Sequence, residues 1–237
     1  MSLLTIRSNS RIAKDVYRMT LQGEFCMKPG QFINIKINET ATPFLRRPIS
    51  VCDINDDELT IIYKVFGAGT LELSKKTIGT KLDCLLDLGN GFEVVEEDEI
   101  YLIGGGVGVP PLLYLAKHLK GKLRFVLGFT SSEDIFLQKE LEKYGTVEIA
   151  TIDGTVGHHG NVVDLLKDRK VNYFYACGPE PMLKALGKIY TKGQLSFEER
   201  MGCGFGACMG CSCKTLTGYK RICVEGPVLK TEEIIWD

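Results

Sequence analysis

The chain has 237 residues, of which 44% are hydrophobic and 25% are charged, and its formal net charge at pH 7 is −1. This composition provides ample apolar side chain for a core, and the near-neutral charge gives no electrostatic reason to expect nucleic acid as a partner. The longest apolar runs are interrupted by glycine and proline, so we expect no membrane span. We find no signal-peptide pattern and expect a cytoplasmic protein, in which nine cysteines indicate metal or redox chemistry rather than disulfides.

The first part of the chain alternates short β-rich runs with turn residues. Three runs rich in β-branched and aromatic residues, at 31–37, 47–54 and 59–65, are bounded by Pro-Gly, Asn-Asp-Asp and Gly-Ala-Gly. Strands at this spacing predict a small antiparallel barrel. The stretch GTLELSKK predicts one helix in this region, with Thr70 as its N-cap. We assign residues 1–96 to the barrel domain.

The middle of the chain, residues 97–192, reads as strand and helix in strict alternation. The predicted strands are EIYLIGG, LRFVLGF, TVEIATI and NYFYACG, and the predicted helices are PPLLYLAKHLKG, DIFLQKELEKYG, NVVDLLKDR and EPMLKALGKIY. This alternation predicts an α/β domain with a doubly wound parallel sheet. Residues 193–237 are rich in glycine and cysteine, and we assign them to a small third domain that is too short to fold on apolar burial alone.

The stretch MGCGFGACMGCSCK contains four cysteines, and a fifth, Cys223, follows it. Cys203, Cys208 and Cys211 have the spacing C-x4-C-x2-C, the front half of the plant-type pattern for a [2Fe–2S] cluster. Cys223 is expected to be the distant fourth ligand, so Cys213 is a surplus thiol without a predicted role in ligation. Structural zinc is the alternative, although zinc sites usually contain two separated C-x2-C pairs and this segment contains one.

Two elements in the predicted barrel favour bound phosphate. In RPIS, at 47–50, an arginine can direct two N–H groups at a phosphate while the serine hydroxyl donates beside it. In GAGT, at 67–70, amides at a helix start favour negative charge. Each has an ordinary alternative, a solvated arginine on a strand and a glycine turn before a helix. Together they favour a diphosphate ligand such as FAD.

A glycine-rich loop, GGGVGVPP at 104–111, follows a predicted strand and opens a helix, the context that a dinucleotide-binding loop requires. It departs from the G-x-G-x-x-G pattern, and a plain strand–helix turn is the alternative. CGP at 177–179 ends the last predicted parallel strand, where ligands of open α/β sheets bind. Glu133 and Asp134 would repel a 2′-phosphate and favour NAD over NADP, or would complement a helix dipole.

Six segments carry a resemblance that extends along nearly the whole chain. They are RRPIS, YKVFGAGT, GGGVGVPPL, CGPEPML, ERMGCGFGACMGC and CVEGPV, in this order. Together they resemble the electron-transfer subunits of NAD-dependent (type B) dihydroorotate dehydrogenases, a family of ferredoxin–NADP reductase-like flavoproteins. The surplus Cys213 departs from that family's ligand set. The separation of Cys211 and Cys223 is shorter than in plant ferredoxins, so the fold of the cluster domain cannot be taken from those proteins.

The resemblance implies three cofactors, FAD, a [2Fe–2S] cluster and NAD as electron acceptor, and a set of residues for each. For FAD these are Arg47, Pro48, Ile49, Ser50, Ile62, Tyr63, Lys64, Gly69 and Thr70. For NAD they are Gly104, Gly105, Gly106, Gly108, Cys177, Gly178 and Pro179. For the cluster they are Cys203, Cys208, Cys211 and Cys223, in agreement with the spacing.

These parts belong together because a nicotinamide exchanges two electrons as a hydride, an iron–sulfur cluster passes one, and a flavin converts between the two. The sequence contains no obvious acid–base constellation for an organic substrate, so we assign no catalytic residue and expect the substrate chemistry on a partner. The resemblance implies that this partner is an FMN-containing catalytic subunit that oxidises dihydroorotate in pyrimidine (UMP) synthesis. It also implies a heterotetramer with two subunits of each kind, and we expect the cysteine segment at the interface.

Three other functions stay open at this point. The nearest is the FAD/[2Fe–2S] subunit of a ferredoxin:NAD(P) oxidoreductase. A free-standing reductase would need no partner, but it would leave the appended cluster without a purpose. A zinc-stabilised, non-enzymatic binding module is the alternative from another class, and a brown-yellow purified protein would exclude it.

Overall fold

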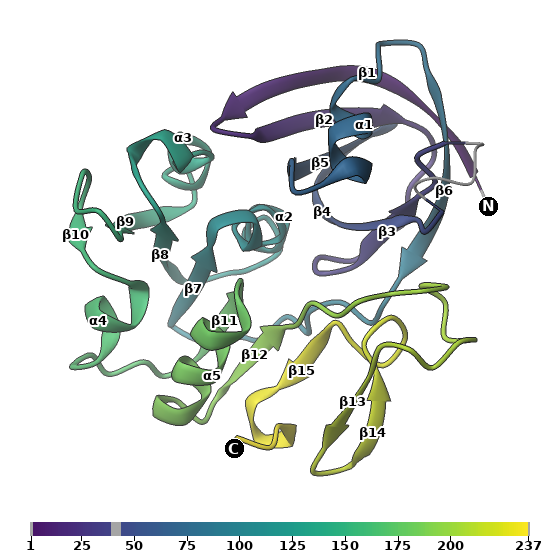
Figure 1. The fold of residues 1–237 in the computed structure, drawn as a ribbon. Coiled ribbons are helices and arrows are strands. Elements are labelled where there is room, and N and C mark those ends of the chain that lie inside the picture. The colour runs from purple at the N-terminus through teal and green to yellow at the C-terminus, as the bar shows by residue number, and fades with distance from the viewer. Residues whose placement is uncertain (1, 39–43, 237) are drawn as a thin grey trace.

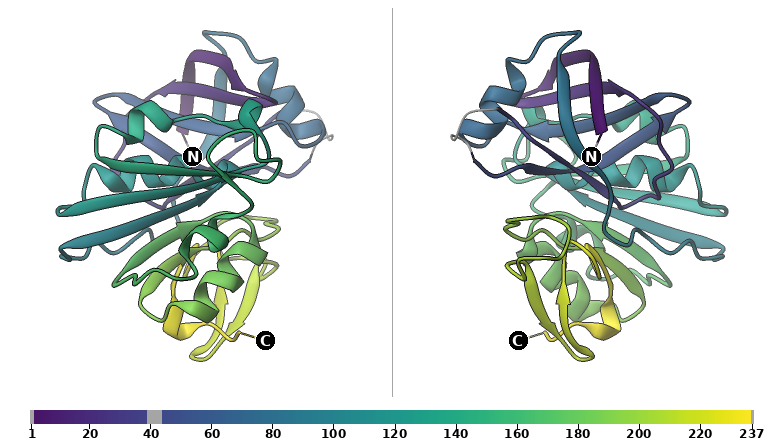
Figure 2. Two further views of the ribbon diagram at one scale, coloured as in Figure 1. Left: turned by 90° about the vertical axis from the view of Figure 1, so that its left-hand side faces the viewer. Right: turned by 90° about the vertical axis from the view of Figure 1, so that its right-hand side faces the viewer.

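The structure, a computed structural model, describes residues 2–38 and 44–236. A barrel, a mostly parallel sheet with helices, and a small C-terminal region follow one another along the chain (Figure 1). The side views show the barrel at one end of the molecule and the C-terminal hairpin at the other (Figure 2). The predicted fold class is therefore confirmed. Within the described ranges, no helix is both long enough and apolar enough to cross a membrane.

The N-terminal region is a closed antiparallel barrel with the strand order β1-β2-β5-β4-β3-β6. Its elements are β1 (Ser2–Ala13), β2 (Val16–Gln22), β3 (Phe32–Ile35), β4 (Arg47–Asn55), β5 (Glu58–Lys64), α1 (Ala68–Ser74) and β6 (Lys81–Leu88). Ile33, Ile35 and Ile61 are fully buried in its interior. The runs of β-branched and aromatic residues between turn residues predicted β3, β4 and β5, and β3 is buried at all four of its positions.

One local prediction in the barrel is wrong. Helix α1 begins at Ala68, with Gly67 as its N-cap, so Thr70 lies inside the first turn instead of capping it. The Thr70 hydroxyl instead accepts a hydrogen bond from the Phe66 N–H at 2.8 Å and donates to the Gly67 carbonyl. The positive φ of Gly67, 121°, lets the chain turn sharply here, which starts the helix before the threonine.

The middle region is a seven-stranded sheet with the order β10-β9-β8-β7-β11-β12-β15, in which only the β12–β15 pair is antiparallel. Its strands are β7 (Glu99–Gly105), β8 (Lys122–Phe129), β9 (Gly145–Thr151), β10 (His158–His159), β11 (Phe174–Cys177), β12 (Gly193–Ser196) and β15 (Val228–Lys230). Its helices are η1 (Gly106–Gly108), α2 (Pro110–Ala116), η2 (Ser132–Asp134), α3 (Gln138–Leu141), α4 (Val162–Leu166) and α5 (Glu180–Ile189).

Both faces of this sheet are covered, which is why its strands read as continuous apolar runs. Along β7, Ile100 and Leu102 belong to the core under α2 and α3. Their neighbours Tyr101 and Ile103 belong to the core under α4 and α5. A strand that is buried on both faces needs apolar side chains at every position.

The C-terminal residues do not form a separate body throughout. The predicted domain boundary at 193 falls before β12, which pairs with β11, and β15 then pairs with β12. The three-part division stays a proposal, with residues 193–196 and 228–230 sharing the sheet. Between them lie the connection that contains the cysteine motif and the hairpin of β13 (Ser212–Thr215) and β14 (Gly218–Arg221). The 3-10 helix η3 (Thr231–Glu233) follows β15.

Candidate functional site

A cavity of about 490 Å³ lies where the three regions meet. Strands β4 and β5 and helix α1 form its barrel wall. Val107 and Cys177 line it from the carboxyl edge of the parallel sheet. Residues 196–199, with Met201 and Pro227, close the third side. The cavity thus lies outside the carboxyl ends of parallel strands, where open α/β sheets bind ligands.

The barrel residues predicted to contact a flavin all line this cavity. The nine are Arg47, Pro48, Ile49, Ser50, Ile62, Tyr63, Lys64, Gly69 and Thr70. The wall combines cationic side chains and hydroxyls with apolar surface, a chemistry that suits a ligand with a diphosphate and an aromatic ring.

Arg47 and Gly69 depend on each other. A Cβ atom on Gly69 would lie 2.2 Å from the Arg47 Nε, so the guanidinium lies across the first turn of α1 only because residue 69 has no side chain. The guanidinium also donates to the carbonyl of Leu45. This arrangement brings a fixed cation to the beginning of α1, where backbone N–H groups have no helical partner.

Several residues of the cavity were not predicted. The barrel adds Phe32 and Phe66, and the C-terminal region adds Phe197, Glu198 and Met201. Phe66 stands directly before the GAGT motif and could have been included with it. The others come from segments far away in the sequence, and no local pattern marks them.

The predicted nicotinamide-binding glycines are explained largely by packing. A Cβ on Gly108 would lie 2.2 Å from the Cys177 carbonyl oxygen, and one on Gly105 would lie 2.8 Å from the Pro179 ring. A Cβ on Gly104 would meet Val109 at 2.7 Å. Only Gly106, with φ of 53°, faces open space. The structure therefore brings the two predicted loops together, and Gly106 is the glycine that leaves its backbone free to meet a ligand.

Cys177 ends β11 and faces the cavity, with its thiol buried. Burial raises the pKa of the Cys177 thiol to about 12, and the Glu198 carboxylate nearby adds to the shift, while a hydrogen bond with Ser196 opposes it. Removal from water also raises the pKa of Glu198. At neutral pH the sheet side of the cavity therefore presents an uncharged thiol beside a carboxyl group whose charge is disfavoured.

Glu133 and Asp134 turn toward the barrel. Lys64 Nζ lies 3.2 Å from Asp134 Oδ1, and Lys14 Nζ lies 3.0 Å from Glu133 Oε2. The Ser131 hydroxyl donates to the other carboxylate oxygen of Asp134 at 3.0 Å. Both carboxylates thus pair with lysines of the barrel, and the preference for NAD over NADP stays a prediction.

The cysteine segment contains two thiol pairs. The Cys208 N–H donates to Cys203 Sγ, and the Cys223 N–H donates to Cys211 Sγ, each at 3.4 Å. Cys213 lies on β13, outside both pairs. Among residues 2–38 and 44–236, no three His, Cys, Asp or Glu groups converge on one point as ligands of a single metal ion. Two pairs suit the predicted [2Fe–2S] cluster, in which four cysteines would serve two irons.

The two pairs differ in their surroundings. Burial opposes ionisation of Cys203, but backbone amides of Cys208, Phe205 and Ala207 donate to its sulfur and lower its pKa to about 6. Burial raises the pKa of Cys223 to about 12, and the thiol of Cys211 beside it acts in the same direction. Amide donors at sulfur stabilise a thiolate, which is the form that binds iron.

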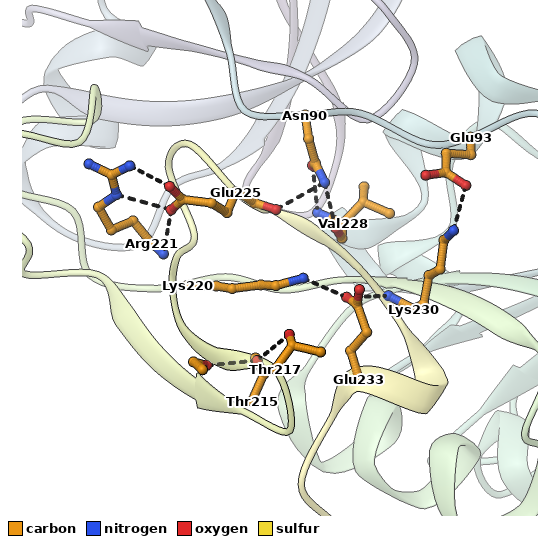
Figure 3. Close-up of polar contacts among 11 residues, drawn as sticks. Asn90, Glu93, Thr215, Thr217, Lys220, Arg221, Glu225, Val228, Lys230 and Glu233 are labelled. Atoms are coloured by element: carbon orange, nitrogen blue, oxygen red, sulfur yellow. Dashed lines mark hydrogen bonds and ion pairs between the residues drawn. The ribbon is translucent and has the colours of Figure 1, made fainter.

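Polar contacts fasten the hairpin region to the rest of the molecule (Figure 3). The Asn90 side chain donates to the Val228 carbonyl at 2.7 Å and accepts from the Val228 N–H at 3.1 Å. Glu233 Oε2 lies 2.9 Å from Lys220 Nζ. Further ion pairs join Lys230 to Glu93 and Arg221 to Glu225. These contacts hold the loop that contains Cys223 between the hairpin and the barrel–sheet connection.

Strand β3 forms the partition between the cavity and the thiol pairs. Phe32, on its outer face, lines the cavity and packs in one cluster with Cys211 and Cys223. Two residues further on, Asn34 contacts the segment at Cys203. The candidate flavin site and the candidate metal site therefore share one wall.

Comparison with known proteins identifies this combination. Residues 198–235 match the family model of the iron–sulfur cluster binding domain of dihydroorotate dehydrogenase B. A dihydroorotate dehydrogenase B (NAD⁺) electron transfer subunit of Bacillus velezensis is 45% identical over 98% of this chain and 97% of its own. The chain belongs to this family of electron-transfer subunits. A member from Fusobacterium nucleatum is 40% identical over 97% of this chain and 96% of its own.

Solved structures extend the comparison. An NADH-dependent reduced ferredoxin–NADP oxidoreductase, described in connection with flavin-based electron bifurcation, superimposes with a TM-score of 0.89 at 29% identity, covering 100% of this chain and 91% of that one. A ferredoxin–NADP⁺ reductase from Neisseria gonorrhoeae, with bound FAD and NADP, superimposes with a TM-score of 0.66 at 15% identity. It covers 79% of this chain and 89% of its own, and at this identity it shows the fold alone.

Proposed function

We propose that this subunit passes electrons from the FMN of a dihydroorotate-oxidising catalytic partner, through a [2Fe–2S] cluster and FAD, to NAD⁺. The observation that carries the proposal is the shared wall: Phe32 lines the flavin cavity and packs against Cys211 and Cys223. When bound, the cluster exchanges single electrons, the flavin exchanges one or two, and NAD⁺ takes up a hydride. The reaction is a step of pyrimidine synthesis, in a cytoplasm where thiols stay reduced.

The chain's own residues bind and orient these groups. Arg47, lying across Gly69 at the start of α1, would hold the flavin diphosphate, and Ile49 and Ile62 would contact the ring system. Cys203 with Cys208 would hold one iron, and Cys211 with Cys223 the other. Gly106 and the turn at 177–179 would receive the nicotinamide nucleotide from the sheet side of the cavity.

The cysteine segment is the proposed docking face for the catalytic partner. Phe205 and Met209 lie within the ligand loop, and their side chains are 58% and 55% exposed. Large apolar side chains exposed beside a redox centre suit a protein interface that brings a second redox centre close. We propose a heterotetramer with two subunits of each kind.

A second candidate is the FAD/[2Fe–2S] subunit of a ferredoxin:NAD(P) oxidoreductase. The observation that favours it is the TM-score of 0.89 with the reduced ferredoxin–NADP oxidoreductase over the whole chain. The proposed substrate, however, follows the relatives that are 40% and 45% identical, which are dihydroorotate dehydrogenase subunits. The match of residues 198–235 to an iron–sulfur domain also counts against a zinc-stabilised module.

The test is an anaerobic pull-down of the tagged chain from its own cytosol, followed by addition of dihydroorotate and NAD⁺. Co-elution of an FMN protein and formation of NADH, followed at 340 nm, is the expected result. The matched control is the tagged Cys223→Ser chain, which should lose the dihydroorotate-dependent formation of NADH. The opposite result is a coloured eluate, with the co-eluting partner present, that is reduced by NADH but not by dihydroorotate. This result would instead favour the ferredoxin-linked function.

A further inference from the structure

The outer face of β3 contacts both thiol pairs through two residues. Ile33 and Ile35 point into the barrel and are fully buried. The alternate positions, Phe32 and Asn34, therefore share the opposite face. Phe32 packs with the Cys211–Cys223 pair. Asn34 contacts the loop that contains Cys203, which belongs to the other pair.

The contact of Asn34 is close and polar. Its side-chain Nδ2 donates to the Cys203 carbonyl at 3.4 Å. A Cβ on Gly204 would lie 2.2 Å from the same Nδ2, so the amide group fits against the backbone only because residue 204 is glycine. Gly204 has φ of 79°, a conformation that favours glycine for a second reason. The turn at Cys203–Gly204 is thus shaped around the Asn34 amide.

The other end of the same amide has no partner. Asn34 is 1% exposed, and its Oδ1 makes no hydrogen bond. An unpaired buried acceptor costs about 1–3 kcal/mol, so an apolar side chain of similar size would suit the barrel alone better. The polar group has a use only toward the loop, where its N–H meets the Cys203 carbonyl.

The backbone of Asn34 connects this contact to the cavity wall. Asn34 pairs across the strands with Pro48, which lines the cavity, and its carbonyl accepts from Arg46. Arg46 also forms a largely buried ion pair with Asp83 at 2.8 Å, which fixes this part of the barrel. The ligand loop is therefore attached through one side chain to a rigid part of the flavin-binding domain.

We propose that Asn34 is a positioning residue, which fixes the Cys203–Gly204 turn against the barrel and so sets the environment of the cluster on the side of Cys203 and Cys208. The inference rests on the proposed [2Fe–2S] cluster and adds a residue of the barrel to its surroundings. An N–H donor at the carbonyl of a ligand residue favours the extra negative charge of the reduced cluster. Loss of the donor should make the cluster harder to reduce.

The test uses the full-length chain with FAD and cluster bound, and three variants. Asn34→Leu removes the donor and the unpaired acceptor at similar volume. Asn34→Asp keeps the shape but places an acceptor against the Cys203 carbonyl. Thr20→Val is the matched control, because it deletes the 2.8 Å side-chain hydrogen bond between Thr20 on β2 and Ser8 on β1, and β2 lies across the closed barrel from β3.

Two quantities are measured. One is the ratio of oxidised to reduced cluster at a fixed redox potential of the solution, and the other is the electron paramagnetic resonance spectrum of the reduced cluster. We expect Asn34→Leu to raise the ratio about threefold to tenfold, the size of one hydrogen bond, and Asn34→Asp to raise it further. The resonance should change in both variants. Thr20→Val should match the wild type in ratio and spectrum, and all variants should retain FAD.

Two results would overturn the inference. The first is that Asn34→Asp, which keeps the side-chain volume, shows the same oxidised-to-reduced ratio and the same spectrum as the wild type. The other is a Thr20→Val protein with the same shift as Asn34→Leu, since the effect would then come from general loosening of the barrel. Iron and sulfide are measured first in the wild-type protein. Their absence would overturn the proposed cluster together with this inference, whereas their presence with unchanged variants would overturn this inference alone.

Discussion

The cysteine segment packs against β3 of the barrel, and the two regions are stabilised in different ways. The barrel is a closed sheet without a free edge, and its interior cluster consists of fifteen buried residues together with Tyr114 of α2. The cluster around the thiols has five buried residues, of which two are cysteines and two, Phe32 and Leu229, come from β3 and β15. The segment therefore depends on packing against neighbouring strands, on polar contacts and on its thiols.

This difference indicates which site is formed before its cofactor binds. A closed barrel with a full core holds Arg47, Gly69 and Thr70 in place by packing, so the flavin wall should exist in the apoprotein. A loop with a small core needs metal ligation to become rigid, because metal binding contributes directly to folding. We expect loss of the cluster to loosen the segment and leave the barrel intact.

The largest effect should come from removing a cluster ligand. Cys223→Ser deletes one thiolate of the Cys211–Cys223 pair, and we expect complete loss of the iron–sulfur absorbance with flavin absorbance retained. Cys213→Ser is the matched control: it removes the thiol outside both pairs and should keep the cluster. Iron and sulfide content and visible spectra measure both. The reverse pattern would show that Cys213 is a ligand and that the pairing is misassigned.

The next effect sharpens the comparison by testing whether the segment keeps its shape without metal. In the folded, cluster-free protein, amide donors overcome burial and lower the pKa of Cys203 to about 6, while burial raises that of Cys223 to about 12. At pH 7 Cys203 should therefore be alkylated at least about a hundredfold faster than Cys223, whose side chain is also buried. Mass spectrometry of iodoacetamide-treated protein follows each cysteine.

The lowered pKa of Cys203 also predicts how the stability of the folded, cluster-free segment changes with pH. The folded pKa of Cys203 lies below its ordinary value of 9.0, so this thiol stabilises the folded segment increasingly as the pH rises from about 6 to about 9. The contribution is lost as the pH falls through about 6. Equal alkylation rates for all five cysteines of the segment would mean that it unfolds without its metal, and the contrast with the barrel would be greater than proposed.

The sequence predicted the barrel side of the site better than the other sides, for a physical reason. The motifs RPIS and GAGT place their residues through local strand and turn geometry, so the cavity wall follows from nearby residues. Asn34 contacts Cys203 across 169 positions, and only the folded chain brings them together. The pairing of β12 with β15 is likewise nonlocal. The prediction of Thr70 as N-cap was wrong because Gly67, with its positive φ, starts the helix earlier.

A third prediction tests how rigid the barrel wall is. Gly69→Ala introduces a Cβ 2.2 Å from Arg47 Nε, and the guanidinium must move away from the start of α1. We expect FAD affinity to fall about tenfold, the size of one charge-assisted hydrogen bond, with the fold of the apoprotein unchanged. Flavin fluorescence titration gives the affinity. Leu71→Ala, an exposed position of α1 outside the cavity, is the control and should bind FAD normally. Unchanged affinity in Gly69→Ala would remove Arg47 from the diphosphate site.

The smallest effect concerns the joint between the barrel and the sheet. Asp134→Asn removes the ion pair with Lys64 at 3.2 Å but can keep the hydrogen bond from Ser131. Because Lys64 is partly exposed, the expected loss of stability is only about 1 kcal/mol, seen as a small, salt-sensitive fall in melting temperature. The preference for NADH over NADPH should not change, since the carboxylate is directed at the barrel and not at a nucleotide. A marked gain in NADPH use would show that Asp134 faces the nucleotide after all. The barrel would then be held to the sheet without this ion pair, through the apolar cluster that the two regions share.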